Sequence, residues 1–354
     1  MDKKSKIQEL WQECFNDTPE FVEMYFNRMY SDDNALLLEK NGAPASAMLL
    51  QRYAMNFHGD VADMGYICGT ATSANARCNG YMQELLSYAI SLSFRRGDLL
   101  CALIPASERL YEYYSRFGFA PVFHFREEHY TSLHTFQVHD RYCRDENQNA
   151  PDIYTAFSGM MRQRMNCVLH NEDDFLCILE DNRLDNGSFI IMRNGSGEIA
   201  SMAWSVERNG QIIVYDILSR DCDARNAALD EIRRHATGKP ITVWGYPEES
   251  NGGQLKVHGM ARVINAGQLL DRLAAKYPRY NTSIRLSDPI IPENNHTFIL
   301  NSGHCSIDDT IHGPAIDFDL YIDTFTSIVF SSEKTGYLLG FPTHPPFMSL
   351  MMDQ

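Results

Sequence analysis

The chain has 354 residues and a formal net charge of -15 at pH 7, which argues against binding to nucleic acid or to an anionic membrane surface. Hydrophobic residues make up 44% and charged residues 22%, a composition typical of a globular protein with two or three domains. No apolar run is long enough to cross a bilayer, and the N-terminal segment is amphipathic rather than a secretion signal. The sequence therefore predicts a cytoplasmic protein.

The first predicted elements are two helices. Apolar residues recur at helical spacing from Ile7 to Cys14, and Thr18-Pro19 offers an N-cap followed by proline at the first helical position. Two strands, residues 35–39 and 45–53, are then predicted, because Asn41-Gly42 between them is a strong hairpin turn signal.

A possible phosphate-binding loop follows. Residues 66–72 form a predicted strand, a loop of small residues leads to Arg77-x-x-Gly80, and residues 81–94 form a predicted helix. A turn that opens a helix directs several backbone N–H groups and the positive end of the helix dipole at one point, which suits a pyrophosphate. The same pattern also fits a loop that only turns into a surface helix. The dinucleotide and P-loop fingerprints are absent from the sequence.

The region downstream makes the pattern more specific. A buried strand is predicted for residues 98–105 and a helix for residues 106–114, ending in Phe117-Gly118-Phe119. This order of loop, helix, strand and Tyr-x-x-Phe-Gly-Phe ending resembles the GNAT N-acetyltransferase superfamily. The sequence departs from that family at Tyr81-Met82, where small residues are usual, which puts the fit of the loop in doubt.

The resemblance implies that the loop binds the pyrophosphate of acetyl-coenzyme A and that Tyr114 protonates the leaving thiolate. Tyr114 also fits an aromatic residue packed at a helix end. The residues predicted to contact acetyl-coenzyme A are Thr70, Ala71, Thr72, Arg77, Cys78, Asn79, Gly80, Tyr81, Met82, Ser107 and Glu108.

A second hairpin resembles the first. Residues 189–210 repeat the layout of residues 36–53, with an apolar run, an Asn-Gly turn and a returning strand that opens on Ala-Ser. The polar stretch 140–151 between the two copies is predicted to be a surface connection, and a helix is predicted over residues 225–232. After a short helix that begins near Ile264, four strand-like segments follow: TSIRLSD, TFILNSG, CSIDD and DFDLYID.

The layout of the whole chain resembles the enhanced intracellular survival (Eis) protein family. The predicted fold class is α/β (α+β), with tandem GNAT folds built on mixed, splayed sheets and a sterol-carrier-like α+β domain. The predicted domains are a catalytic GNAT domain at 1–145, a degenerate GNAT-like domain at 146–255 and the sterol-carrier-like domain at 256–354. The second copy has no R-x-x-G loop, so its role is predicted to be structural. The resemblance also implies a homo-oligomer, specifically a hexamer.

The predicted activity is transfer of an acetyl group from acetyl-coenzyme A to a primary amine of a cationic acceptor, either a small molecule or a peptide. In the Eis family the base is the C-terminal carboxylate, which here belongs to Gln354, with Asp353 adding negative potential. The tail FPTHPPFMSLMMDQ is stiffened by proline and rich in apolar residues, so docking is expected. An ordinary packed terminus is the alternative.

Two non-enzymatic functions remain open. One is an acyl-coenzyme A sensor whose C-terminal domain carries a lipid, and the other is a purely structural protein. No metal site is predicted, because the twelve histidines and nine cysteines show no ligand spacing, and the isolated cysteines are predicted to be reduced.

Overall fold

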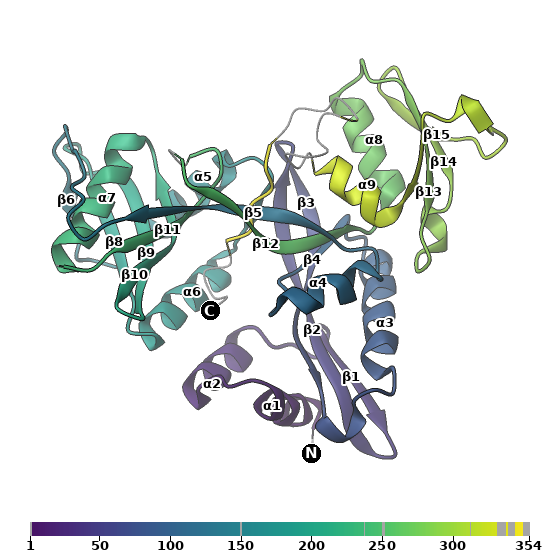
Figure 1. Ribbon diagram of the computed structural model, residues 1–354, viewed down its shortest axis with the longest axis horizontal. Helices are drawn as coiled ribbons and strands as arrows, with labels where there is room; N and C mark the ends of the chain where they lie inside the picture. Colours follow the sequence, from purple (N-terminus) through teal and green to yellow (C-terminus); the bar gives the residue numbers. More distant parts are fainter. Residues whose placement is uncertain are drawn as a thin grey trace.

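The computed structural model describes residues 2–148, 151–236, 238–249, 252–311, 313–330, 338 and 344–349. These residues form three lobes, with helices on mixed β-sheets (Figure 1), so the predicted mixed α/β class is confirmed. No helix in this part of the chain is long and apolar enough to span a membrane.

The lobes follow the order of the chain. The first contains α1 Lys3–Cys14, α2 Pro19–Arg28, β1 Ala35–Lys40, β2 Ala43–Phe57, β3 Asp60–Thr72, the 3-10 helix η1 Ala74–Ala76, α3 Tyr81–Arg95, β4 Leu100–Leu103, α4 Glu108–Ser115 and β5 Ala120–Tyr130. The second contains β6 Cys143–Arg144, α5 Ile153–Gln163, β7 Cys167–Leu169, α6 Glu172–Leu184, β8 Ser188–Arg193, β9 Ile199–Arg208, β10 Gln211–Ser219, α7 Cys222–His235 and β11 Ile241–Gly245. After β12 Gln254–Val263, the third contains α8 Ala266–Lys276, β13 Thr282–Ser287, η2 Pro292–Asn294, β14 Thr297–Asn301, β15 His304–Ile307, η3 Gly313–Ala315, β16 Phe318–Tyr321 and α9 Ile322–Val329.

Local sequence signals account for the helix starts and tight turns that were predicted. The Thr18 hydroxyl accepts a hydrogen bond from the backbone N–H of Phe21, and Pro19 occupies the first turn of α2. Asn41 and Gly42 have φ values of 54° and 79°, as the two-residue turn between β1 and β2 requires. Both predictions are confirmed because the signals act within a few residues of the chain.

The large sheet joins the first two lobes. Its strands run in the order β1-β2-β3-β4-β12-β5-β11-β10-β9-β8-β6, and β7 pairs with β2. Strand β12 therefore lies between β4 and β5, although more than a hundred residues separate it from them in the chain (Figure 1). The predicted boundary at residues 255/256 falls inside this strand, and the division into three domains stays a prediction.

The third lobe packs α8 and α9 against a four-stranded sheet of order β15-β14-β13-β16. All four predicted strand segments lie in this sheet, while helix α9 was not predicted. Buried Arg262 on β12 fixes this lobe to the first one. Its Nη2 donates to both carboxylate oxygens of buried Asp288 at 2.6 and 2.7 Å, and its Nη1 donates to the Phe117 carbonyl at 2.7 Å.

Candidate active site

A notch opens where β3 and β4 diverge. Strand β3 pairs with β2 as far as Thr72, but its parallel pairing with β4 covers only residues 64–66 against residues 100–102. Among the described residues, no strand pairs with the β4-facing edge of β3 beyond Tyr66. Backbone polar groups along this edge can therefore bind a ligand. This divergence is the splay that the sequence resemblance implied.

A β-bulge in β3 directs side chains into the notch. Ile67 packs in the core with α3, the Cys68 thiol contacts the Tyr25 hydroxyl on α2 at 3.2 Å, and a Cβ at Gly69 would collide with Trp11 on α1. Cys68 and Gly69 thus face the same side of the sheet, which interrupts the alternation of a regular strand. As a result Thr70 points toward α4. Gly69 has φ of 59°, a conformation that glycine adopts without strain.

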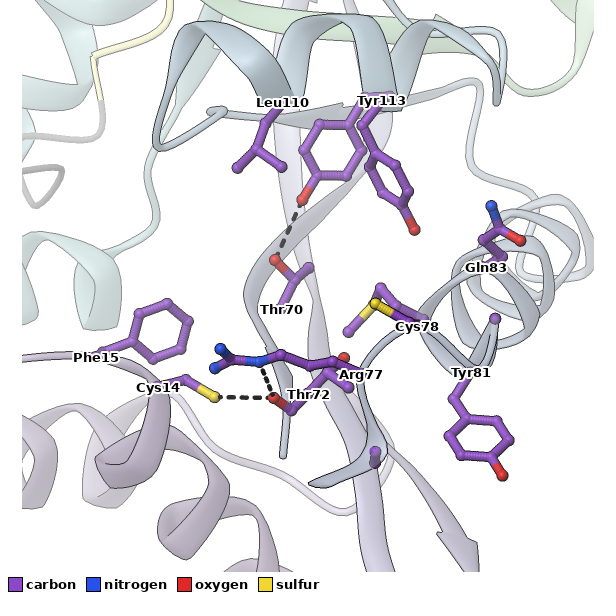
Figure 2. A pocket seen from close by; sticks show the side chains of 14 residues that line it. Cys14, Phe15, Thr70, Thr72, Arg77, Cys78, Tyr81, Gln83, Leu110 and Tyr113 are labelled. Carbon is purple, nitrogen blue, oxygen red and sulfur yellow. Dashed lines mark hydrogen bonds between the residues drawn. The ribbon is translucent and has the colours of Figure 1, made fainter. Parts of the chain in front are cut away.

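A pocket of about 710 Å³ lies at the open end of the notch, between α4, α3 and the end of α1 (Figure 2). This volume suits a small-molecule ligand. The residues that line the pocket are Cys14, Phe15, Thr70, Thr72, Ala76, Arg77, Cys78, Gly80, Tyr81, Met82, Gln83, Leu110, Tyr113 and Tyr114.

Most of the residues predicted to contact acetyl-coenzyme A lie at this pocket, and four do not line it. Ala71 is buried beneath α1, and Asn79 braces the loop by donating to the carbonyls of Ala76 and Arg77. Ser107 and Glu108 are exposed at the start of α4. Cys14 and Phe15 also line the pocket and were not predicted from the sequence. They lie at the end of α1, which is held against β3 by the packing of Trp11 over Gly69.

The loop before α3 has the backbone geometry of an anion site. Cys78 and Gly80 have φ values of 63° and 77°, and left-handed residues in such turns form concavities lined by N–H groups. Gly80 is the N-cap of α3 and supplies no side chain to cap the helix. The first turn of α3 therefore keeps N–H donors for an anion. Exposed Arg77 adds positive charge, with its Nε donating to the Thr72 carbonyl at 3.3 Å.

Helix α7 occupies the matching place in the second lobe and is closed to an anion. The Asp221 carboxylate caps the helix, accepting from the Ala224 N–H at 2.8 Å. Asp223 in the first turn accepts from the backbone N–H groups of His139 and Asp140. Carboxylates thus stand where α3 leaves its donors open, and they repel phosphate.

Tyr114 on α4 faces β3 across the notch. Its hydroxyl lies 3.1 Å from the Thr70 hydroxyl, and Figure 2 shows this hydrogen bond at the top of the pocket. Burial raises the pKa of Tyr114, and the hydrogen bond with Thr70 acts in the opposite direction. Tyr114 is therefore protonated at neutral pH and can donate a proton. Burial also raises the pKa of neighbouring Tyr113 to about 12.

Residues 344–349 form a strap that is bound between the lobes. Phe347 donates its N–H to the Asn166 carbonyl at 2.9 Å and accepts from the Val168 N–H at 3.2 Å. His124 donates its N–H to the Pro346 carbonyl at 3.0 Å, and the Ser349 carbonyl lies 2.7 Å from Nε2 of His170. Phe347, Met348 and Ser349 are buried. The predicted base, the carboxylate of Gln354, and the neighbouring Asp353 lie outside the described residues.

Comparisons with known proteins concern the family and the fold. Residues 2–122 match the family model described as an acetyltransferase (GNAT) domain. No curated protein matches the chain.

Three solved structures share the fold along nearly the whole chain. A GCN5-related N-acetyltransferase from Anabaena variabilis has a TM-score of 0.77 at 12% identity, over 97% of this chain and 96% of its own. A GCN5-related N-acetyltransferase from Kribbella flavida has a TM-score of 0.75 at 12% identity, over 98% of this chain and 97% of its own. Eis1 from Mycobacterium abscessus has a TM-score of 0.71 at 10% identity, over 92% of this chain and 86% of its own. At such identities the likeness establishes the fold alone, and the match to the acetyltransferase (GNAT) domain model is confined to residues 2–122.

Proposed function

We propose that the chain is an N-acetyltransferase that moves an acetyl group from acetyl-coenzyme A to a primary amine. One observation carries the proposal: the Tyr114–Thr70 hydrogen bond and the open N-terminus of α3 belong to the same pocket, at the point where β3 leaves β4. A proton donor and an anion site thus share one cavity with unpaired strand backbone.

The proposed mechanism assigns each requirement of acetyl transfer to part of this chain. N–H groups at the start of α3, together with Arg77, bind the pyrophosphate. Backbone N–H groups of β3 beyond Tyr66 polarise the thioester carbonyl. As the amine nitrogen forms its bond to the carbonyl carbon and the C–S bond breaks, Tyr114 gives its proton to the leaving thiolate. The hydroxyl and a thiol have similar reference pKa values of about 10 and 8.5, so this transfer is nearly balanced.

The C-terminal carboxylate is proposed as the base that removes the proton from the amine. The position of the strap supports this assignment, because the Met348 methyl contacts Gly259 beside the end of β4. Five residues follow Ser349 and can span at most about 17 Å, a length sufficient for an active site only if the strap ends close to it. A free carboxylate has a pKa near 3.5, so it would attract the ammonium and pass its proton to solvent through an oriented water molecule rather than hold it.

The proposed acceptor is cationic, in keeping with the charge of -15. The experiment that tests the function is thiol release from acetyl-coenzyme A in the presence of polyamines, aminoglycosides and lysine peptides. Turnover with any of these amines supports the enzyme. Tight coenzyme A binding without turnover would instead support the alternative, a non-catalytic acyl-coenzyme A sensor or lipid-binding protein.

A further inference from the structure

A second, smaller cavity lies where the strap meets the first two lobes. Aromatic rings from four strands line it, together with the last described residues of the strap. The lining residues are Phe125, Tyr215, Trp244, His258, Phe347, Met348 and Ser349. Trp244 forms the centre of the ring cluster: its ring centroid lies 4.8 Å from that of Phe125 and 5.2 Å from that of Tyr215.

One polar group in this cavity lacks a partner. The Ser349 side chain is 96% buried, since its exposed fraction is 4%, and its hydroxyl makes no hydrogen bond within the described residues. A buried hydroxyl without a partner is destabilising, so a ligand that hydrogen-bonds there gains affinity. Aromatic faces beside a hydroxyl that can accept a hydrogen bond match a cation that also donates hydrogen bonds.

The size of the cavity narrows the choice of ligand. Its volume of about 10 Å³ is room for one water-sized group, and a primary ammonium group has that size. Trp244 and His258, which line the cavity, are partly exposed. Buried Arg164, whose guanidinium lies 5.4 Å from the ring centroid of Phe347, does not add net positive charge. It is bound by the carboxylates of Asp216 and Glu249 at 2.8 and 2.7 Å.

The cavity adjoins the notch. Met348, which lines it, packs against Gly259, because a Cβ at Gly259 would lie 2.4 Å from the Met348 methyl and 3.1 Å from the carbonyl oxygen of Leu103, at the end of β4. Tyr111 on α4, one turn before Tyr114, donates its hydroxyl to the His258 carbonyl at 3.1 Å. The cavity is therefore connected through single residues to the end of β4, which borders the notch, and to the helix that carries Tyr114.

We propose that this aromatic cavity binds a second ammonium group of the acceptor, so that the preferred substrates are diamines or larger polyamines. This assignment rests on the proposed acetyl transfer in one respect: the other amine of the same ligand is the one that is acetylated. The distal ammonium would stack on Trp244 and donate to the Ser349 hydroxyl while the other amine reaches the notch.

The test compares 1,4-diaminobutane with n-butylamine, which have equal chain length and differ by one ammonium group. Binding to the coenzyme A-saturated protein is measured by calorimetry, and thiol release from acetyl-coenzyme A is measured in parallel. We expect the diamine to bind about tenfold more tightly than the monoamine. A series from three to six carbons should show one best length.

The matched variants are Trp244→Phe, which keeps an aromatic face, and Trp244→Leu, which removes it. The diamine preference should survive in W244F and disappear in W244L. Equal affinities in the wild type, or an undiminished preference in W244L, would overturn the cavity assignment, and a single bound water would then explain the space. A diamine preference without thiol release from either amine would keep the binding site and reject the proposed acetyl transfer to these amines.

Discussion

At the scale of single residues, Tyr114 and Thr70 depend on each other. The bulge at Gly69 reverses which face of the sheet the following side chains of β3 point to, and this directs Thr70 toward α4. The Thr70 hydroxyl then lies 3.1 Å from the Tyr114 hydroxyl. Burial keeps the phenol protonated by raising its pKa, while the hydrogen bond with Thr70 limits that rise. A tyrosine with a pKa far above that of a thiol would be a poor proton donor to a thiolate, so the pair is suited to acid catalysis.

Tyr114→Phe tests this role. The variant keeps the ring that packs in the core of the first lobe and removes the hydroxyl that donates the proton in the proposed mechanism. We expect turnover to fall about 100-fold or more, with coenzyme A affinity nearly unchanged. Stopped-flow thiol release and calorimetric titration of coenzyme A separate the two quantities. Unchanged turnover would remove Tyr114 from the mechanism.

At the scale of secondary-structure elements, the two lobes differ in how the helix after the third antiparallel strand begins. Helix α3 starts at Gly80 with no side-chain cap, and α7 starts at Asp221 with a carboxylate bonded to its first turn. This single position decides which helix can accept an anion, because the same backbone donors serve either a cap or a ligand.

Substitution at Gly80 tests the anion site. Gly80→Asn and Gly80→Asp have nearly the same shape, and Asn tolerates the left-handed conformation that Gly80 adopts at φ of 77°. We expect Gly80→Asp to bind coenzyme A at least about tenfold more weakly than Gly80→Asn, because the added carboxylate repels the pyrophosphate. The difference should shrink in 1 M salt, as screening predicts. Equal affinities for the two variants would place the pyrophosphate elsewhere.

The strap is a second element with a testable role. Deleting Met351 to Gln354 leaves the hydrogen bonds of residues 344–349 in place, so we expect a change in Tm of only about 2 °C. Activity should fall at least about tenfold, because the deletion removes the proposed base. Gln354→Ala is the matched control: it changes the side chain, retains the terminal carboxylate and should remain active. An active deletion variant would assign the base to a side chain.

At the scale of the whole molecule, His58 lies where the three lobes meet. It is in the turn between β2 and β3, its N–H donates to Asn166 Oδ1 in the second lobe at 2.8 Å, and its Nδ1 lies 3.0 Å from the Tyr277 hydroxyl in the third. Burial lowers the pKa of His58 to about 4, and the nearby His344 and Lys276 act in the same direction. Protonation at this junction therefore opposes the packing of the lobes.

The sign of the pH effect follows from that shift. The unfolded chain binds a proton on His58 near pH 6.5 and the folded chain only near pH 4, so stability falls as the pH drops between these values. From pH 7 to pH 5 the free energy of unfolding is expected to fall by about 2 kcal/mol. Urea unfolding of the wild type and of His58→Asn at pH 7, 6 and 5 measures this change. The variant should lose less stability on acidification, and an identical slope would show that His58 does not titrate as described.

The amino-acid sequence by itself determined the features that depend on neighbouring residues. The Asn41-Gly42 turn, the Thr18-Pro19 helix start and the Arg77 to Met82 loop all lie as predicted, because capping and turn conformations are decided within a few residues. The strands of the third lobe were recognisable for the same reason. Helix α9 was missed, since its apolar residues directly continue the strand-like segment of β16.

Only the tertiary structure decided how distant segments meet. Strand β12 enters the sheet between β4 and β5, the strap crosses between lobes, and Cys14 reaches the pocket through the packing of Trp11 on Gly69. The hydrogen bond between Thr70 and Tyr114 likewise joins residues 44 positions apart. Pairings of this kind leave no periodic signal in the chain, because they are selected by the burial of apolar surface in the complete fold.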